Sequence, residues 1–288
     1  MPAISSPTVK RRRLAAELHA CREQAGLTIE DVALELEWSA AKVSRIENAR
    51  VRVLPRDVKH LLRTYGVADS DPAWDMLVTL ARESRQKGWW HAYGDTIGES
   101  FSTYVGLEAE AETLRTYESE CVPGLLQTED YARAVVGAAL AAPGTDNGIE
   151  RNVALRMSRQ LRLTESASPE LWAVVNEGAI RRLVGRPVVM HAQLDRLLEA
   201  SHQPGITLQV LPFSAGAHAG MGGAFTIICL PEPGDPDVAY VNYNSGSLFL
   251  EKPDELRRCA MIFDHLCAAA LSIGQSRDMI TRIANELA

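Results

Sequence analysis

One segment near the N-terminus carries side chains suited to contacting the edges of DNA bases. Arg45 can donate two parallel hydrogen bonds to O6 and N7 of a guanine, which discriminates against other bases by about 1–3 kcal/mol. Ser44 can reach a base or a phosphate, whereas Ala40 and Ala41 offer only apolar contact, for instance to a thymine methyl group. Together with Asn48, these side chains predict a surface that enters the major groove of duplex DNA.

Basic residues around this segment supply the charge that phosphates attract. Arg50 and Arg52 follow it directly, and Lys42 and the basic arm 10–13 are further candidates for phosphate contacts, which set the position on DNA but do not specify its sequence. Taken singly, each arginine is also typical of a solvated surface. The residues predicted to contact DNA are Thr28, Ser39, Ala40, Ala41, Lys42, Ser44, Arg45, Asn48, Arg50 and Arg52.

Three short helices are needed to present these side chains. Leu14, Leu18 and Cys21 recur at spacings of four and three, which predicts the apolar stripe of a first helix, and Gly26 marks its end. Thr28 is a favourable N-cap for a second helix, in which Val32, Ala33 and Leu36 face inward.

The third predicted helix carries the proposed DNA contacts. Ser39 caps it, and it extends from Ala40 to Asn48. Val43 and Ile46 are the apolar residues that face the core, so Arg45 faces outward. Two short helices joined by a turn of about three residues predict a helix-turn-helix motif.

Residues 10–67 resemble the Xre/Cro/phage-repressor family of helix-turn-helix domains. The matching run is LTIEDVALELEWSAAKVSRIENAR, followed by Pro55 and a helix ending in LLRTYGV. The resemblance implies an all-α, lambda-repressor-like fold. It also implies a structural ion pair between an arginine of the first helix, here Arg22, and a glutamate late in the third, here Glu47.

The match departs from that family at three positions. Ile29 stands where many relatives have a DNA-contacting glutamine, so that contact is expected to be missing. Glu37 occupies a turn position often held by glycine, and Ala49 replaces a common glycine after the third helix. A left-handed backbone at either position would cost a non-glycine residue energy.

Composition supports a DNA-binding end joined to a different kind of domain. The net charge is −7, yet residues 1–65 hold 12 of the 30 Lys and Arg and only 8 of the 37 Asp and Glu. No apolar stretch reaches the length of a membrane span or a signal-peptide core, and the cysteines are scattered, which is typical of reduced thiols. We therefore expect a cytoplasmic protein without membrane contact. The cysteines are Cys21, Cys121, Cys229, Cys259 and Cys267.

The chain is predicted to be multidomain. We place an all-α helix-turn-helix domain at residues 10–83, a junction at 84–99, and an α+β domain at 100–288 that binds a partner or signal and mediates dimerisation. Alternating apolar runs and turn signals in the last segment predict a sheet of about four or five strands. A helix is expected from Tyr104 to Thr116.

A second resemblance covers nearly the whole chain. KGWWHAYGD, YVGLEAEA, VPGLLQTEDYA and VVNEGAIRRLVG occur in that order, followed by LQVLPFSAGAHAGMGGAF. These landmarks are similar to actinobacterial helix-turn-helix regulators with an uncharacterised C-terminal domain. The resemblance implies an antitoxin-like or developmental regulator and a small protein partner encoded nearby.

Two further features are candidates for a ligand or partner site. Trp89 and Trp90 form an aromatic cluster that suits either ligand stacking or a core at the domain junction. His218 lies among the glycines of segment 212–225, which suits either a binding loop or a flexible connection. No catalytic set, cofactor motif or metal-ligand set stands out, so an enzyme is not expected. We predict a homodimeric DNA-binding regulator controlled by a small protein partner, or alternatively a small-molecule-sensing repressor.

Overall fold

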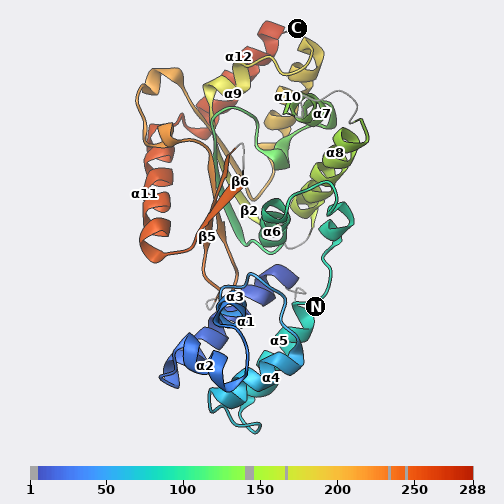
Figure 1. The fold of residues 1–288 in the computed structure, drawn as a ribbon. Coiled ribbons are helices and arrows are strands. Elements are labelled where there is room, and N and C mark those ends of the chain that lie inside the picture. The colour runs from blue at the N-terminus through green and yellow to red at the C-terminus, as the bar shows by residue number, and fades with distance from the viewer. Residues whose placement is uncertain (1–5, 140–145, 166–167, 233–234, 244–245, 288) are drawn as a thin grey trace. The chain divides into compact units, whose positions relative to one another are not determined.

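The computed structural model describes residues 6–139, 146–165, 168–232, 235–243 and 246–287 (Figure 1). Contacts divide the chain into two compact units. The N-terminal unit comprises Met1–His91 with Glu232–Asp235, and the C-terminal unit comprises Ala92–Pro231 with Pro236–Ala288.

The N-terminal unit is helical. Its helices are α1 (Pro7–Gln24), α2 (Ile29–Glu35), α3 (Ala40–Glu47), α4 (Pro55–Thr64) and α5 (Pro72–Glu83). The predicted caps form: Thr28 and Asp31 make a capping box at α2, and the Ser39 side chain accepts a hydrogen bond from the backbone of α3. Val43, Ile46, Leu18 and their neighbours form one buried core.

The basic run 10–13 differs from our prediction of an arm. It lies inside α1, which begins at Pro7 because Ser6 caps it and proline is favoured in the first turn. Lys10 is buried and pairs with Glu83 of α5 at 3.0 Å. At least this residue therefore stabilises helix packing instead of offering its charge to a phosphate.

The C-terminal unit contains a six-stranded sheet of order β3-β2-β1-β4-β5-β6. Strands β1, β2 and β3 run parallel, and β4, β5 and β6 pair antiparallel, starting from β1. The strands are β1 (Thr113–Glu118), β2 (Glu170–Asn176), β3 (Ile206–Leu211), β4 (Phe225–Cys229), β5 (Val238–Tyr243) and β6 (Gly246–Leu250).

The prediction of four or five strands was wrong, and so was the helix through Thr116. Helix α6 (Glu99–Glu108) ends earlier, and residues 113–118 form β1 at the centre of the sheet. The threonines and the tyrosine of that segment suit a strand, and Leu114 and Thr116 alternate with residues that face the other side. The predicted class, an all-α domain followed by an α+β domain, is confirmed.

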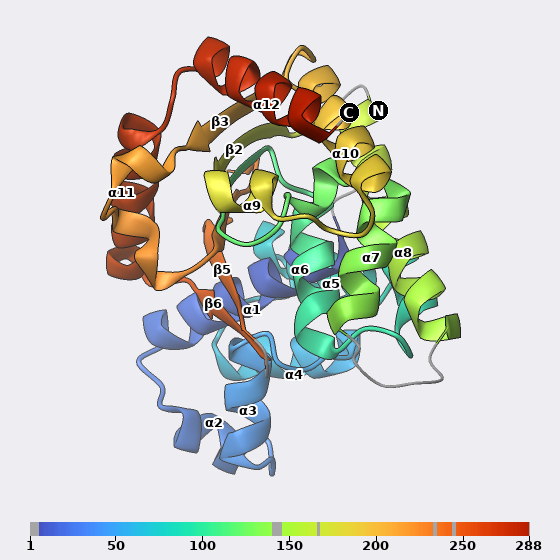
Figure 2. The ribbon, with the colours of Figure 1, turned by 90° about the horizontal axis from the view of Figure 1, so that it is seen from above.

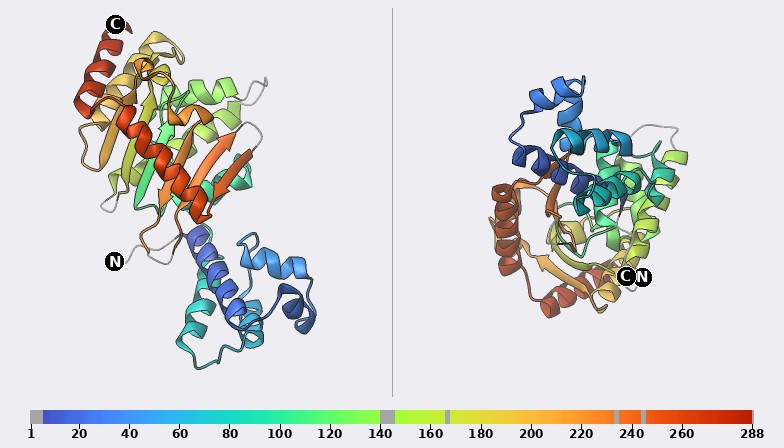
Figure 3. Two further views of the ribbon diagram at one scale, coloured as in Figure 1. Left: turned by 90° about the vertical axis from the view of Figure 1, so that its left-hand side faces the viewer. Right: turned by 90° about the horizontal axis from the view of Figure 1, so that it is seen from below.

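Helices cover both faces of this sheet (Figures 2 and 3). Helix α11 (Pro253–Ala269) packs on one face, where Phe263 and Leu266 belong to the same buried cluster as Tyr117 of β1. The opposite side carries α6, α7 (Glu129–Ala139) and α8 (Asp146–Gln160) (Figure 2). The remaining helices are α9 (Glu177–Arg181), α10 (Pro187–Ala200) and α12 (Ile273–Leu287). None of the helices in the described ranges combines the length and the hydrophobicity that a membrane span requires.

Candidate nucleic-acid interface

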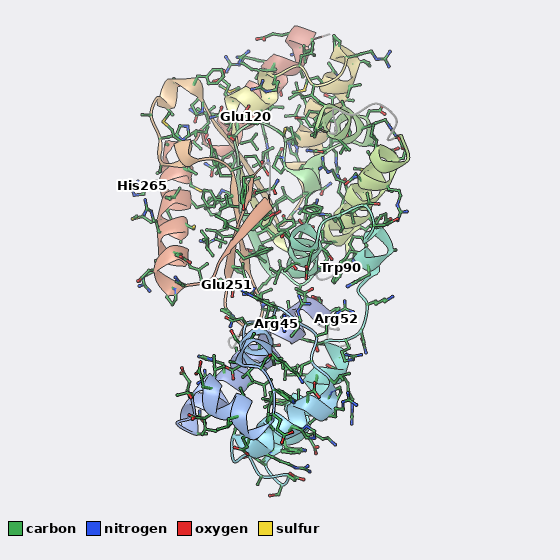
Figure 4. The ribbon with its side chains drawn as sticks, viewed as in Figure 1. Arg45, Arg52, Trp90, Glu120, Glu251 and His265 are labelled. Atoms are coloured by element: carbon green, nitrogen blue, oxygen red, sulfur yellow. The ribbon has the colours of Figure 1, made fainter. Side chains whose placement is uncertain are left out.

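Helix α3 separates a buried face from an exposed one. Val43 is 0% exposed and Ile46 is 3% exposed, so both side chains are fixed in the core. Arg45 lies between them in the sequence of α3 and is labelled in Figure 4. Arg45 is exposed, as are Ala41 and Asn48. This is the arrangement that places an arginine where it can reach a base edge.

The remaining residues of the α3 surface are less free. Ser44 is half-buried, and both its carbonyl and its hydroxyl accept hydrogen bonds from the Asn48 amide. Ala40 packs partly against the core. Arg45 and Ala41 are therefore the predicted base contacts that carry no such restraint in the structure.

The two N-cap side chains are occupied by capping. The backbone N–H of Asp31 donates to the Thr28 hydroxyl at 3.1 Å, and the Thr28 hydroxyl and backbone N–H both donate to the Asp31 carboxylate. These bonds lower the pKa of Asp31, the Thr28 hydroxyl having the largest effect. The Ser39 hydroxyl accepts from the Lys42 backbone at 3.2 Å. Both residues thus hold the helix starts in place.

The basic residues around α3 differ in how far their charge is compensated. The Lys42 ammonium lies 3.2 Å from the centre of the Trp38 ring and 3.3 Å from the Asp57 carboxylate. Arg50 is exposed. Arg52 is exposed and its Nη2 donates to Nε2 of His91 at 2.6 Å.

The Arg52 contact requires a neutral His91 imidazole. Its Nε2 accepts from Arg52, and its Nδ1–H donates to the Gly88 carbonyl at 3.1 Å. Burial lowers the pKa of His91, and the nearby Arg52 lowers it further. Arg52 keeps its charge in this contact, because a neutral imidazole accepts the bond without cancelling it.

Arg22 and Glu47 come together in the core of the N-terminal unit. The Arg22 Nε lies 3.0 and 2.9 Å from the two oxygens of Glu47, and Arg22 Nη1 donates to the Leu27 carbonyl at 2.8 Å. The Tyr65 hydroxyl also donates to Glu47, at 2.9 Å, and His19 lies 3.1 Å from the same carboxylate. Burial, followed by the Glu47 charge, raises the pKa of Tyr65 well above its usual range.

Sequence reasoning missed the parts played by Tyr65 and His19. A signal for Tyr65 was present, since a tyrosine in an apolar stripe such as LLRTYGV needs a partner for its hydroxyl once buried. Nothing in the local pattern places His19 near Glu47, because the two are 28 residues apart. Their contact depends on how α1 packs against α3.

The aromatic pair Trp89 and Trp90 is divided between surface and core. Trp90 is 2% exposed and Trp89 is 44% exposed, with the rings edge to face at 5.9 Å. Gly88 is required here, since a Cβ would lie 2.3 Å from the Trp90 ring. This burial favours the core interpretation for Trp90.

His218 lies in the C-terminal unit and has a local structural contact. Its Nδ1 accepts from the Gly220 backbone at 3.2 Å, and its ring packs edge-on against Tyr117 at 5.9 Å. Gly220 cannot carry a side chain without collision, because a Cβ would lie 2.7 Å from Tyr117. Segment 213–222 thus forms two short 3₁₀ turns on the sheet.

Comparison with known families assigns both units. A family model described as "Domain of unknown function (DUF5753)" matches residues 101–282. A family model described as "Helix-turn-helix domain" matches residues 13–73. Searches of curated proteins and of solved structures found no match.

Proposed function

Because the chain belongs to the DUF5753 family and carries a helix-turn-helix domain ahead of that family's domain, we propose that it is a sequence-specific transcription regulator of the Xre type, acting on DNA in the cytoplasm. The observation that supports this most is the placement of Arg45. It is exposed on α3 while Val43 and Ile46 anchor the same helix in the core.

The proposed division of labour on α3 follows from the contacts. Arg45 reads a base, and Ala41 contacts an apolar group beside it. Arg50 and Arg52 hold phosphates, and Lys42 contributes less because Trp38 and Asp57 already hold its charge. Thr28 and Ser39 orient the helices that approach the duplex.

We further propose that the regulator binds DNA as a homodimer. A single helix-turn-helix reads one half-site, and pairs of half-sites one helical turn apart give the usual specificity. In this proposal the DUF5753 domain holds the two copies together. Light scattering of the full chain at micromolar concentration, with and without DNA, measures the stoichiometry directly.

Selection of binding sites from random duplex DNA tests the proposed function. The wild-type chain should enrich a defined motif, and Arg45→Ala should lose its preference at one base pair while keeping its circular dichroism spectrum. Arg82→Ala, on the exposed surface of α5, is the matched control and should enrich the wild-type motif. Failure of the wild type to enrich any motif would refute the proposal.

Regulation through the DUF5753 domain has two candidate forms. An antitoxin-like form would bind a small protein encoded nearby, which co-expression with the neighbouring reading frame and co-elution from a sizing column would test. The other form senses a small molecule, and a cavity in the C-terminal unit favours it.

A further inference from the structure

A cavity of about 300 Å³ lies inside the C-terminal unit, between the sheet and the segments that cover it. Small-molecule sites in proteins generally measure about 300–1,000 Å³. Residues from α6, α8 and the segment 121–127 form its walls. The cavity therefore has the size of a site for a compact organic molecule.

The floor of this cavity is built by strand register. Thr116 of β1 is paired with Thr226 of β4, which is paired with Tyr240 of β5, so the three side chains share one face. The two threonine hydroxyls lie 3.0 Å apart. The Tyr240 hydroxyl lies 3.0 Å from the Ser247 hydroxyl.

One of the two arginines in the wall is fully compensated. The Nε and Nη2 of Arg159 donate to the two oxygens of Glu108 at 2.7 and 2.6 Å, and both side chains are buried. The Arg159 guanidinium also packs against the rings of Phe101 and Tyr104, at 5.3 and 5.4 Å. It serves as a fixed, neutralised part of the wall.

The second arginine is not compensated. Arg156 Nη1 donates to the Gln127 amide oxygen at 2.6 Å, and within the described part of the chain no carboxylate lies within ion-pair distance of it. Burial lowers the pKa of Arg156 to about 10, so it stays charged at neutral pH. Arg156 is only partly exposed to solvent. A charge that has lost much of its hydration and has no ion-pair partner is unfavourable, and an anion entering the cavity would relieve that cost.

Glu118 lines the same cavity, two residues beyond Thr116 on β1. Burial raises its pKa to about 7, against the opposing effect of Arg156 and Arg159 on α8. The cavity is also lined by Cys121, Tyr104 and Tyr240. Burial raises the pKa of each of these three groups, so none of them adds a negative charge near neutral pH. The Glu118 carboxyl is therefore mostly protonated below pH 7 and about half protonated at pH 7, whereas Arg156 keeps its full charge over this range.

We propose that this cavity binds a small organic monoanion with an aromatic or apolar body, whose carboxylate pairs with Arg156 while Glu118 hydrogen-bonds to a second polar atom. Phe101, Tyr104 and Tyr240 provide the surface on which the body packs. The inference rests on the proposed function in one respect: it makes the bound acid the signal to which the regulator responds.

Aromatic acids paired with their amides test the site. Phenylacetate and indole-3-acetate, each alongside its carboxamide, are titrated into the full chain by calorimetry. The acids should bind at least about tenfold more tightly than the amides, because only the acids form a charge-assisted bond with Arg156. Arg156→Met should abolish this preference, and Arg151→Met, elsewhere on α8, should leave it unchanged.

The Glu118→Gln variant gives a second, independent measurement. An anion beside Glu118 favours its protonated form, so the wild type should bind the acids more weakly as pH rises from 6 to 8, and Glu118→Gln should lose this dependence. If Arg156→Met does not fold, the acid–amide comparison in the wild type decides. Equal binding of acid and amide, or no binding of either, overturns the proposal.

Site selection on the same preparations separates the two proposals. A defined DNA motif without acid binding would refute the ligand site and leave the regulator intact. Acid-selective binding without any DNA motif would refute the regulator and leave the ligand site. A signal role further requires that phenylacetate or indole-3-acetate change the affinity of the chain for its motif, and an unchanged affinity refutes that role.

Discussion

Each of the two units of this chain contains a buried glutamate that bonds to an arginine and to a tyrosine. In the helical unit, Glu47 accepts from Arg22 at 2.9 Å and from the Tyr65 hydroxyl at 2.9 Å. In the sheet unit, Glu108 accepts from Arg159 at 2.6 Å and from the Tyr104 hydroxyl at 2.8 Å. Each glutamate is thus shared between an arginine and a tyrosine.

The units differ in the surroundings of a second arginine, one that forms no ion pair with a carboxylate in the described part of the chain. In the helical unit one such arginine is Arg45, which is exposed on α3, where the proposed partner is duplex DNA. In the sheet unit one such arginine is Arg156, which is only partly exposed and lines a cavity of about 300 Å³. In both units an arginine paired with a glutamate stabilises the fold. The exposure of the second arginine, Arg45 or Arg156, determines whether duplex DNA or a small anion is the partner that we propose for it.

The largest effect on stability is expected when the Glu108 carboxylate of the sheet unit is removed. Glu108→Leu leaves Arg159 unpaired beside Arg156, which should cost about 3–5 kcal/mol of stability. Hydrogen exchange, followed by mass spectrometry on peptides from β1 and β2, measures the stability of the sheet unit separately from that of the helical unit. Glu165→Leu, which removes the exposed partner of Arg162, should lower the stability by less than about 1 kcal/mol.

The double variant sharpens this test. Adding Arg159→Met to Glu108→Leu removes the stranded charge and should recover most of the lost stability. If the double variant is less stable than Glu108→Leu alone, the pair does not act through charge compensation.

A smaller effect is expected for the matching residue of the helical unit. Glu47→Ala should cost about 3 kcal/mol, because Arg22 keeps its bond to the Leu27 carbonyl and His19 is half exposed to water. Base preference in site selection should not change, since Glu47 is buried behind α3. If the Glu47→Ala variant melts at the wild-type temperature, Glu47 does not stabilise the helical unit in the way proposed for Glu108 in the sheet unit.

The two units should also respond to pH in opposite directions. The pKa of Glu118 is raised from 4.5 to about 7 in the fold, so the folded state binds a proton that the unfolded chain has lost, and this contribution disappears as pH rises through 7. This contribution to the free energy of unfolding is about 3 kcal/mol at most, because one pKa unit corresponds to about 1.4 kcal/mol. Asp31 has a lowered pKa, so its contribution is present above its usual range and disappears as pH falls.

Glu118→Gln isolates this difference. The stability of the sheet unit between pH 5 and 8, followed by hydrogen exchange corrected for the intrinsic rate, should fall less steeply in the variant than in the wild type. Parallel pH profiles for the two proteins would show that Glu118 is not protonated in the fold.

Local patterns predicted the helical unit well and the sheet unit only in part. Caps and apolar spacing placed α2 and α3, since those signals act over one or two turns. Five strands were recognised from turn signals, but β1 was merged with α6 because its apolar residues continue the helical spacing from Tyr104. The cavity could not be predicted, because Glu118 and Arg156 lie 38 positions apart and meet only through strand pairing and helix packing.

The smallest expected effect on stability comes from backbone strain at two positions where the sequence suggested a left-handed conformation. Glu37 and Ala49 have φ of 54° and 55°, and in the described part of the chain they are the non-glycine residues with positive φ. Each follows a helix whose end is closed by backbone bonds, such as Trp38 to Ala33 and Arg50 to Arg45. The sheet unit uses glycine at its positive-φ positions, including Gly185 and Gly205.

Replacing Glu37 or Ala49 with glycine tests whether their left-handed backbone lowers the stability of the helical unit. Glu37→Gly and Ala49→Gly should each stabilise it by about 0.5–1 kcal/mol, because relief of the left-handed strain exceeds the added freedom of the unfolded chain. Ala25→Gly is the matched control, since Ala25 caps α1 with φ −73°, and it should be neutral or destabilising. Should all three glycines lower the melting temperature alike, backbone strain at positions 37 and 49 would be negligible, and that difference between the units would vanish.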